Sequence, residues 1–236
     1  MRKEAKKKET DQVKKVNMFN DATGTGSAML LYQPSAESIL VFNRGLVNKV
    51  AEFKFVSVDD LPIEIQFLLS CGFIPNLERV KRLLPLVCPL ELRVPGAGFT
   101  ALDWAARKGL FDIAQLLCQS EPGLVHLGAP VGWACYTNRV ELAKMLVSHG
   151  ANPNTTDQVL YSFKPTAFVA AENGSLLALK WLAEEAGVDI KKLRDRSGGG
   201  ILAVIATSRG PRVPNNPLLP AAVACAQYAR SKGASQ

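Results

Sequence analysis

Apolar residues recur in this chain as pairs of short helical stripes. The clearest pair lies in residues 98–120, on either side of a turn at Lys108–Gly109. Its first stripe is Leu102, Ala105 and Ala106, and its second is Ile113, Leu116 and Leu117. The i, i+3, i+4 spacing predicts two amphipathic helices of about ten residues each. Two helices of this length cannot close a hydrophobic core alone, so the unit is expected to stack on copies of itself.

Four further copies of the helix pair follow the same spacing. They are residues 62–86, 128–154, 164–190 and 197–234. The residue that precedes the small pair in each copy recurs every 29 to 37 residues, at Phe67, Trp104, Trp133, Val169 and Ile205. In the third copy Asn138 replaces the turn glycine. Asparagine tolerates positive φ better than most residues, so the turn is expected to persist.

Residues 98–120 resemble the ankyrin repeat, whose pattern reads G-x-T-P-L-H-x-A-A-x-x-G-H-x-E-I-V-x-L-L. The matching residues are Gly98, Thr100, Leu102, Ala105, Ala106, Gly109, Ile113, Leu116 and Leu117. Ala101, Asp103 and Leu110 stand where the pattern has proline and two histidines. The resemblance implies an all-α solenoid of about five helix-turn-helix repeats over residues 62–236.

Two segments precede the expected repeats. Residues 1–35 have no helical stripe and are interpreted as an irregular, basic N-terminal arm. Residues 36–61 are interpreted as a capping helix and linker, because solenoid ends need their own cover. The apolar face of that helix would be Ile39, Phe42, Leu46, Val50 and Phe53.

The last repeat contains an insertion at residues 211–220. Pro211, Pro214, Pro217 and Pro220 prevent this segment from forming a helix. The second helix of the repeat is therefore expected at 221–232. The insertion is either a docking loop or a degenerate part of a terminal repeat.

The net charge of +7 is concentrated at the N-terminus, where residues 1–16 hold seven basic and three acidic side chains. The basic residues of the arm are Arg2, Lys3, Lys6, Lys7, Lys8, Lys14 and Lys15. Such a run suits an acidic protein face, RNA or an anionic membrane surface. The alternative is a solvated terminus without a partner.

Composition favours a folded protein of the cell interior. The chain has 236 residues, of which 47% are apolar and 21% charged. No transmembrane helix and no secretory signal are expected from its hydrophobic pattern. Five cysteines, an odd number, are typical of a reducing compartment. A cytoplasmic location is expected, with a mitochondrial or other organellar one as the alternative.

The sequence offers little for catalysis, and no enzyme activity, cofactor or metal is expected. The two histidines, His126 and His149, have no ligand partners at metal spacing, and no nucleotide or nucleophile motif occurs. The glycines at 198–200 suit an anion nest, although the repeat pattern makes them a turn. Trp104, Trp133 and Trp181 occupy repeat positions that predict a buried core.

The resemblance implies a protein-binding surface at the hairpin tips and at the two residues that follow the alanine pair. The candidate residues are Phe99, Arg107, Lys108, Tyr136, Thr137, Tyr161, Lys164, Glu172, Asn173, Ser208 and Arg209. The chain is therefore interpreted as a protein–protein interaction scaffold, held as an accessory subunit of a larger assembly and contacting several of its proteins. The alternatives are an RNA- or ribosome-associated protein that uses the lysine arm, and a free adaptor with a transient partner.

Overall fold

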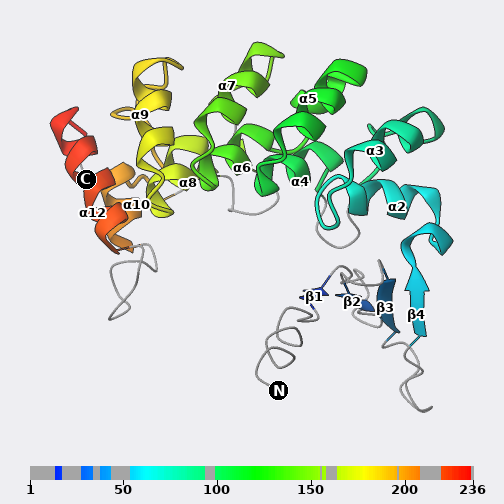
Figure 1. The fold of residues 1–236 in the computed structure, drawn as a ribbon. Coiled ribbons are helices and arrows are strands. Elements are labelled where there is room, and N and C mark those ends of the chain that lie inside the picture. The colour runs from blue at the N-terminus through cyan, green and yellow to red at the C-terminus, as the bar shows by residue number, and fades with distance from the viewer. Residues whose placement is uncertain are drawn as a thin grey trace, which may run out of the picture.

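In the computed structural model the described residues are 14–17, 28–33, 38–43, 54–93, 99–154, 156–157, 164–195, 197–207 and 219–234. Within them, a four-stranded antiparallel sheet is followed by a row of helix pairs (Figure 1). The strands of the sheet, in order β1-β2-β3-β4, are β1 Lys14–Asn17, β2 Ala28–Gln33, β3 Ser38–Asn43 and β4 Lys54–Ser57. The helices of the row are α2 Ile63–Ser70, α3 Leu77–Leu83, α4 Ala101–Lys108, α5 Phe111–Ser120, α6 Pro130–Tyr136, α7 Val140–Ser148, α8 Thr166–Glu172, α9 Leu176–Glu184, α10 Ile201–Thr207 and α12 Leu219–Ser231. Short 3-10 helices lie at η2 Val58–Asp60, η3 Leu84–Leu86 and η4 Pro122–His126, and a two-residue strand pair at β5 Thr156–Asp157 and β6 Lys164–Pro165.

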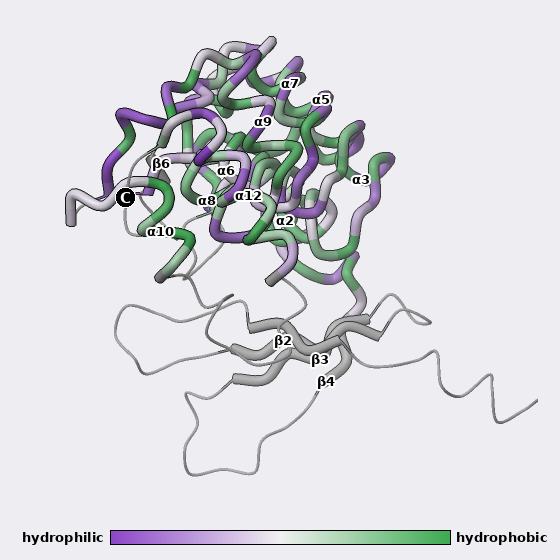
Figure 2. The backbone as a smooth tube through the Cα atoms, turned by 90° about the vertical axis from the view of Figure 1, so that its left-hand side faces the viewer, coloured by the Kyte–Doolittle hydropathy of each residue, from purple (hydrophilic) through white to green (hydrophobic). Residues whose placement is uncertain are grey.

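The helices form five pairs in the described residues: α2/α3, α4/α5, α6/α7, α8/α9 and α10/α12. From α4 onward each first helix packs on the first helix of the next pair, and the second helices pack likewise. The row curves, with the second helices along its outer side (Figure 1). Hydrophobic and hydrophilic stretches alternate along the helices, as expected when one side of each is buried (Figure 2). The expected all-α solenoid of helix-turn-helix repeats is confirmed.

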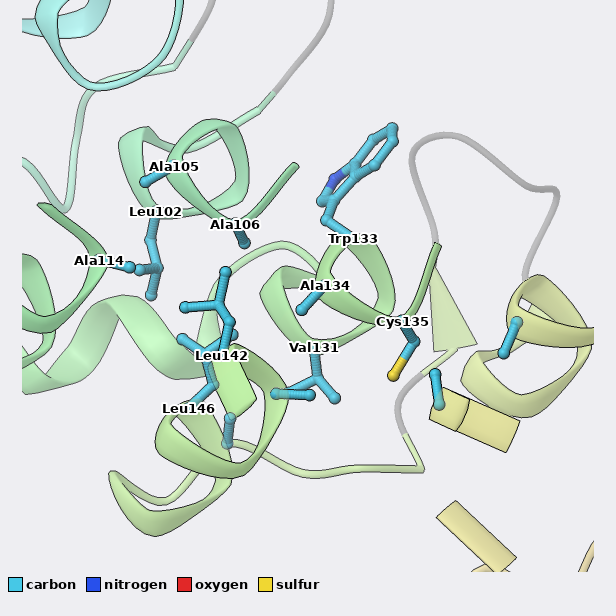
Figure 3. Close-up of a cluster of buried hydrophobic side chains, with 14 of the residues drawn as sticks. Leu102, Ala105, Ala106, Ala114, Val131, Trp133, Ala134, Cys135, Leu142 and Leu146 are labelled. Atoms are coloured by element: carbon cyan, nitrogen blue, oxygen red, sulfur yellow. The ribbon is translucent and has the colours of Figure 1, made fainter. Parts of the chain in front are cut away.

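The core between the second and third repeats follows the stripes read from the sequence. Leu102 of α4 lies beside Ala114 of α5, and Ala106 of α4 lies on the side of Leu142 and Leu146, which belong to α7 of the next repeat (Figure 3). All five are buried. The alanines keep the helices close, while the leucines fill the space between them.

In the second, third and fourth repeats, the turn between the two helices contains a residue with positive φ. Gly109, Asn138 and Gly174 have φ values of 72°, 58° and 67°, so the prediction that Asn138 preserves the turn is confirmed. Its side chain also reaches the fourth repeat, because Asn138 Oδ1 accepts a hydrogen bond of 3.1 Å from the Ala178 N–H at the start of α9. Asparagine therefore supplies an inter-repeat bond that a glycine cannot.

Asp103, which replaces the pattern's histidine, also joins two repeats. Its Oδ2 accepts hydrogen bonds from the Thr100 N–H and hydroxyl, both at 2.9 Å, and the Thr100 hydroxyl accepts one from the Asp103 N–H, which completes a capping box. Its Oδ1 accepts a bond of 2.9 Å from the N–H of Ala129 at the entry to the third repeat. A side chain buried to 2% exposure thus has each carboxylate oxygen satisfied.

The expected capping helix is wrong for residues 38–43 and 54–57, which are strands, and the expected irregular arm contains two strands, β1 and β2. Leu46, Val50 and Phe53 of the expected helix face lie outside the described residues. Residues 38–43 pair with β2 and residues 54–57 pair with β3, in the registers Ser38↔Gln33 and Ser38↔Ser57. The physical reason is the run Ile39–Phe42, in which consecutive apolar and β-branched residues suit a strand, and a run this short does not separate helix from strand by periodicity. β4 leads directly into η2, where Val58 is fully buried at the start of the solenoid.

The fifth repeat has the two expected helices, α10 and α12. The second begins at Leu219, slightly earlier than the expected 221, with Pro220 inside its first turn, where proline is tolerated. The rest of the proline-rich insertion, 211–218, lies outside the described residues.

Candidate protein-binding surface

Three of the expected residue pairs occupy the same place in successive repeats. Arg107 and Lys108 end α4, Tyr136 and Thr137 end or follow α6, and Glu172 and Asn173 end or follow α8. The first pair is exposed and the other two are half-buried. Because α4, α6 and α8 pack side by side, these residues form one row along the solenoid. Tyr161, Ser208, Arg209, Arg2, Lys3, Lys6, Lys7 and Lys8 lie outside the described residues, and Lys14 and Lys15 lie in β1.

An aromatic cluster lies under the first part of this row. The ring of Trp133 contacts Phe99 edge-on, with centroids 5.1 Å apart, and Tyr136, at 5.6 Å. Trp133 extends from α6 on the side away from Leu142 and Leu146 (Figure 3). All three tryptophans are buried as expected, at 4% exposure for Trp133 and 6% for Trp104 and Trp181. Trp133 therefore supports the row from beneath.

The expectation that Phe99 is an exposed aromatic at a hairpin tip is wrong. Phe99 is 7% exposed, because its ring packs against Trp133 and lies beside Arg107. Its contribution is to hold these two neighbours in place. Tyr136 keeps a half-buried ring in the row itself.

Arg107 is held over the aromatic cluster. Its guanidinium carbon lies 4.7 Å from the Trp133 ring centroid and 6.0 Å from that of Phe99. These distances are typical of cation–π contacts. The contact positions the side chain of Arg107, which remains exposed to solvent.

Arg139 is a member of this surface that the sequence analysis missed. It precedes α7, is exposed, and passes across the Gly109 turn, where a Cβ on Gly109 would lie 3.0 Å from its Nε. The aligned residues of the second and fourth repeats, Leu110 and Ser175, carry no charge. A basic residue at that position was the signal available in the sequence.

Arg107 and Arg139 have no ion-pair partner among the described residues, whereas the fourth repeat is neutralised internally. There Lys164 Nζ lies 2.5 Å from Glu172 Oε1, with the Glu172 side chain 12% exposed. Asn173 donates from Nδ2 to the Val169 carbonyl at 2.8 Å. The unpaired positive charge of the row is thus concentrated at the second and third repeats.

The second helices, on the outer side, carry paired charges. Lys144 Nζ lies 2.9 Å from Glu185 Oε2 and 3.9 Å from Glu141 Oε1. The hydrogen bond to Glu185 raises the pKa of Lys144. Lys232 lies 2.9 Å from Glu184, and hydrogen bonds from Lys232 and then Tyr228 lower the pKa of that carboxyl. These charges are already engaged within the molecule.

The glycine run at 198–200 surrounds a carboxylate of the chain itself. Asp195 Oδ1 accepts from the Ser197 hydroxyl at 2.6 Å, from the Ser197 N–H at 2.8 Å and from the Gly199 N–H at 2.8 Å. The hydrogen bonds from the Ser197 hydroxyl and the Gly199 N–H lower the pKa of Asp195. This loop is therefore a closed turn, as the repeat pattern implies, with Asp195 as its anion.

Two further features bear on chemistry. Among the described residues, no group of three or more histidine, cysteine or acidic side chains could hold a metal ion, and none of the helices is long and apolar enough to cross a membrane. Burial raises the pKa of the thiols of Cys118, Cys135 and Cys225 to about 11, 12 and 11, and that of Cys71 still further. These thiols are therefore protonated at neutral pH.

The C-terminal end of the row exposes apolar surface. A groove of about 240 Å³ lies between α10 and α12. It is lined mainly by Leu202, Ile205, Ala222, Val223 and Ala226, with Arg230 beside them. Val223 is 46% exposed.

Comparison with known families agrees with this geometry. Residues 97–127 and 130–158 each match the family model of the ankyrin repeat, and they correspond to the second and third repeats. The chain therefore contains two ankyrin repeats that the family model recognises. A comparison with curated proteins finds no match. Ankyrin repeats bind protein partners, and the proteins that contain them are generally non-catalytic scaffolds.

Proposed function

We propose that this protein is a non-catalytic scaffold that acts as an accessory subunit of a larger intracellular assembly. The observation that carries the proposal is the exposed Arg107, which lies over the buried Trp133, with the half-buried Tyr136 packed on the same tryptophan. Tyrosine and arginine are among the residues that supply much of the energy of protein interfaces. A preformed surface also lowers the ordering cost of binding.

One other feature supports the assembly version over a free adaptor. The C-terminal groove and Val223 leave apolar surface at the fifth repeat, which terminal repeats of free solenoids usually cover with polar residues. The free cysteines, with Cys88 exposed, suit the reducing cell interior that either version requires. One subunit would bind the row that contains Arg107, and another would cover the groove between α10 and α12. The protein would then have two contacts in one assembly.

The test is to isolate the protein from its native cells at mild ionic strength and size the particle with and without nuclease. A large nuclease-resistant particle is expected, and its proteins identify the assembly. Elution near the monomer mass of 25.5 kDa would refute the accessory-subunit role. A nuclease-sensitive particle would favour the RNA-associated alternative.

A further inference from the structure

We infer that the partner presents an acidic peptide segment whose carboxylates bind Arg107 and Arg139 on either side of the Gly109 turn. This inference rests on the proposed scaffold function and gives the chemistry of its partner. We call the site formed by Arg107, Gly109, Trp133 and Arg139 the arginine turn.

Two arginines belong to this part of the row, one near the Gly109 turn in sequence and one in contact with it. Arg107 is two residues before Gly109 and lies over Trp133 at 4.7 Å. Arg139 comes from the next repeat and crosses Gly109, with Nε, Cζ and Cδ at 3.0, 3.4 and 3.5 Å from the position of a Cβ there. Gly109 is thus required for its φ of +72° and for the path of Arg139. Two repeats contribute one cation each to a single site.

The charge of the site is available to a ligand. Within the described residues neither arginine has a carboxylate partner, although Lys81, Lys144, Lys164, Lys192 and Lys232 each have one. Guanidinium groups remain charged at all physiological pH values, and their planar edge matches a carboxylate in two parallel hydrogen bonds. Arg107 remains exposed while its guanidinium carbon lies 4.7 Å from the Trp133 ring centroid, so the guanidinium is positioned and still reachable by a partner.

The same geometry favours an acidic peptide over single-stranded RNA. Binding of single strands depends on exposed aromatic rings on which bases stack, and on a track of many cations along the phosphates. Here Trp133 and Phe99 are 4% and 7% exposed, so their rings are already covered. Two cations at one turn match a short acidic motif.

The first experiment selects binders to the full-length protein from a random library of 12-residue peptides. Enrichment of Asp and Glu in the selected peptides is expected. A labelled selected peptide is then titrated by fluorescence anisotropy. Arg107→Ala/Arg139→Ala should weaken its binding by about tenfold or more, because each charge-assisted hydrogen bond is lost. Arg107→Lys should recover only part of the loss, since lysine lacks the planar edge.

The matched control is Lys191→Ala/Lys192→Ala, which removes two exposed charges elsewhere and should change binding less than about twofold. Two results would overturn the acidic-partner inference and leave the scaffold function standing. One is a set of selected peptides without acidic residues. The other is an acidic peptide that binds the arginine double variant as tightly as it binds the lysine control. A library without any binder would count against the scaffold function itself. Tighter, arginine-dependent binding of a labelled 20-nucleotide RNA would replace the peptide with nucleic acid.

Discussion

The second and fourth repeats use the same two positions in opposite ways. Phe99 and Arg107 in the second repeat align with Lys164 and Glu172 in the fourth, eight residues apart in each case. In the second repeat the aromatic ring lies beside an exposed cation. In the fourth, the cation neutralises a mostly buried anion. The residue two positions before the first helix therefore sets whether the charged residue near the end of that helix is left for a partner or neutralised inside the repeat.

The largest effect is expected at Trp133 of the third repeat, whose ring packs against Phe99 and Arg107 of the second. Trp133→Ala should lower the free energy of unfolding by about 3–5 kcal/mol, because a buried indole with two ring contacts is lost. The aligned residue of the fourth repeat is Val169, and Val169→Ala should cost clearly less, since it removes only two methyl groups. Urea unfolding of both variants measures the difference. Equal losses would mean that the cluster around Trp133 contributes nothing beyond ordinary core packing.

A second contrast lies between Asp103 and its aligned residue Phe168, both buried. Asp103→Ala should cost about 2–3 kcal/mol, because the Ala129 and Thr100 N–H groups lose their acceptor. Asp103→Asn should cost less, since one amide oxygen can still accept. The readout is urea unfolding together with hydrogen exchange at Ala129. Unchanged exchange at Ala129 in Asp103→Ala would contradict the inter-repeat role.

The third contrast concerns the alanine pair. Cys135 occupies the position of Ala106 in the second repeat and Ala171 in the fourth. Burial raises the pKa of its thiol to about 12, so the thiol ionises in the unfolded chain well before it does in the folded one. When folding raises the pKa of a group, the protonated group stabilises the folded state fully at pH values below the unfolded pKa. That contribution to the free energy of unfolding is lost as the pH rises toward the folded pKa.

The wild type should therefore lose stability between about pH 8.5 and pH 12. In Cys135→Ala the loss between pH 7 and pH 10 should be smaller by about 1–2 kcal/mol. Unfolding in urea at the two pH values gives this difference. Identical pH dependence in the two proteins would show that the thiol titrates as easily when folded.

The repeats were predictable from the sequence because their signals are local and recur. The Ala-Ala pair, the turn residue and the apolar stripes each specify a helix boundary or face, and Asn138 met the same requirement as glycine. The N-terminal sheet was not predictable in this way. The run Ile39–Phe42 is too short for its periodicity to distinguish a strand from a helix, and the strands that pair with it lie elsewhere in the chain.

The binding row was predictable only in outline. Positions such as Arg107 and Tyr136 followed from the repeat pattern, but the burial of Phe99 and the path of Arg139 across Gly109 depend on contacts between repeats. Those contacts join side chains of neighbouring repeats, so the sequence of one repeat alone does not specify them. Aligning Phe99 with Lys164 shows that the positions differ in chemistry, while the structure shows what that difference does.

The smallest expected effect directly tests the contrast between Arg107 and Glu172. Lys164→Ala should cost about 1 kcal/mol, because it leaves the mostly buried Glu172 without its cation, and Lys164→Ala/Glu172→Ala should recover part of that loss. Arg107→Ala should cost about 0.5–1 kcal/mol, the value of a cation–π contact at an exposed site. The measurement is a double-mutant cycle by urea unfolding, with peptide binding followed in parallel. If the repeats differ as argued, the Lys164 and Glu172 variants change stability and leave peptide binding intact, whereas Arg107→Ala weakens binding far more than it lowers stability. Loss of peptide binding in the Glu172 variants would instead place the fourth repeat inside the binding site.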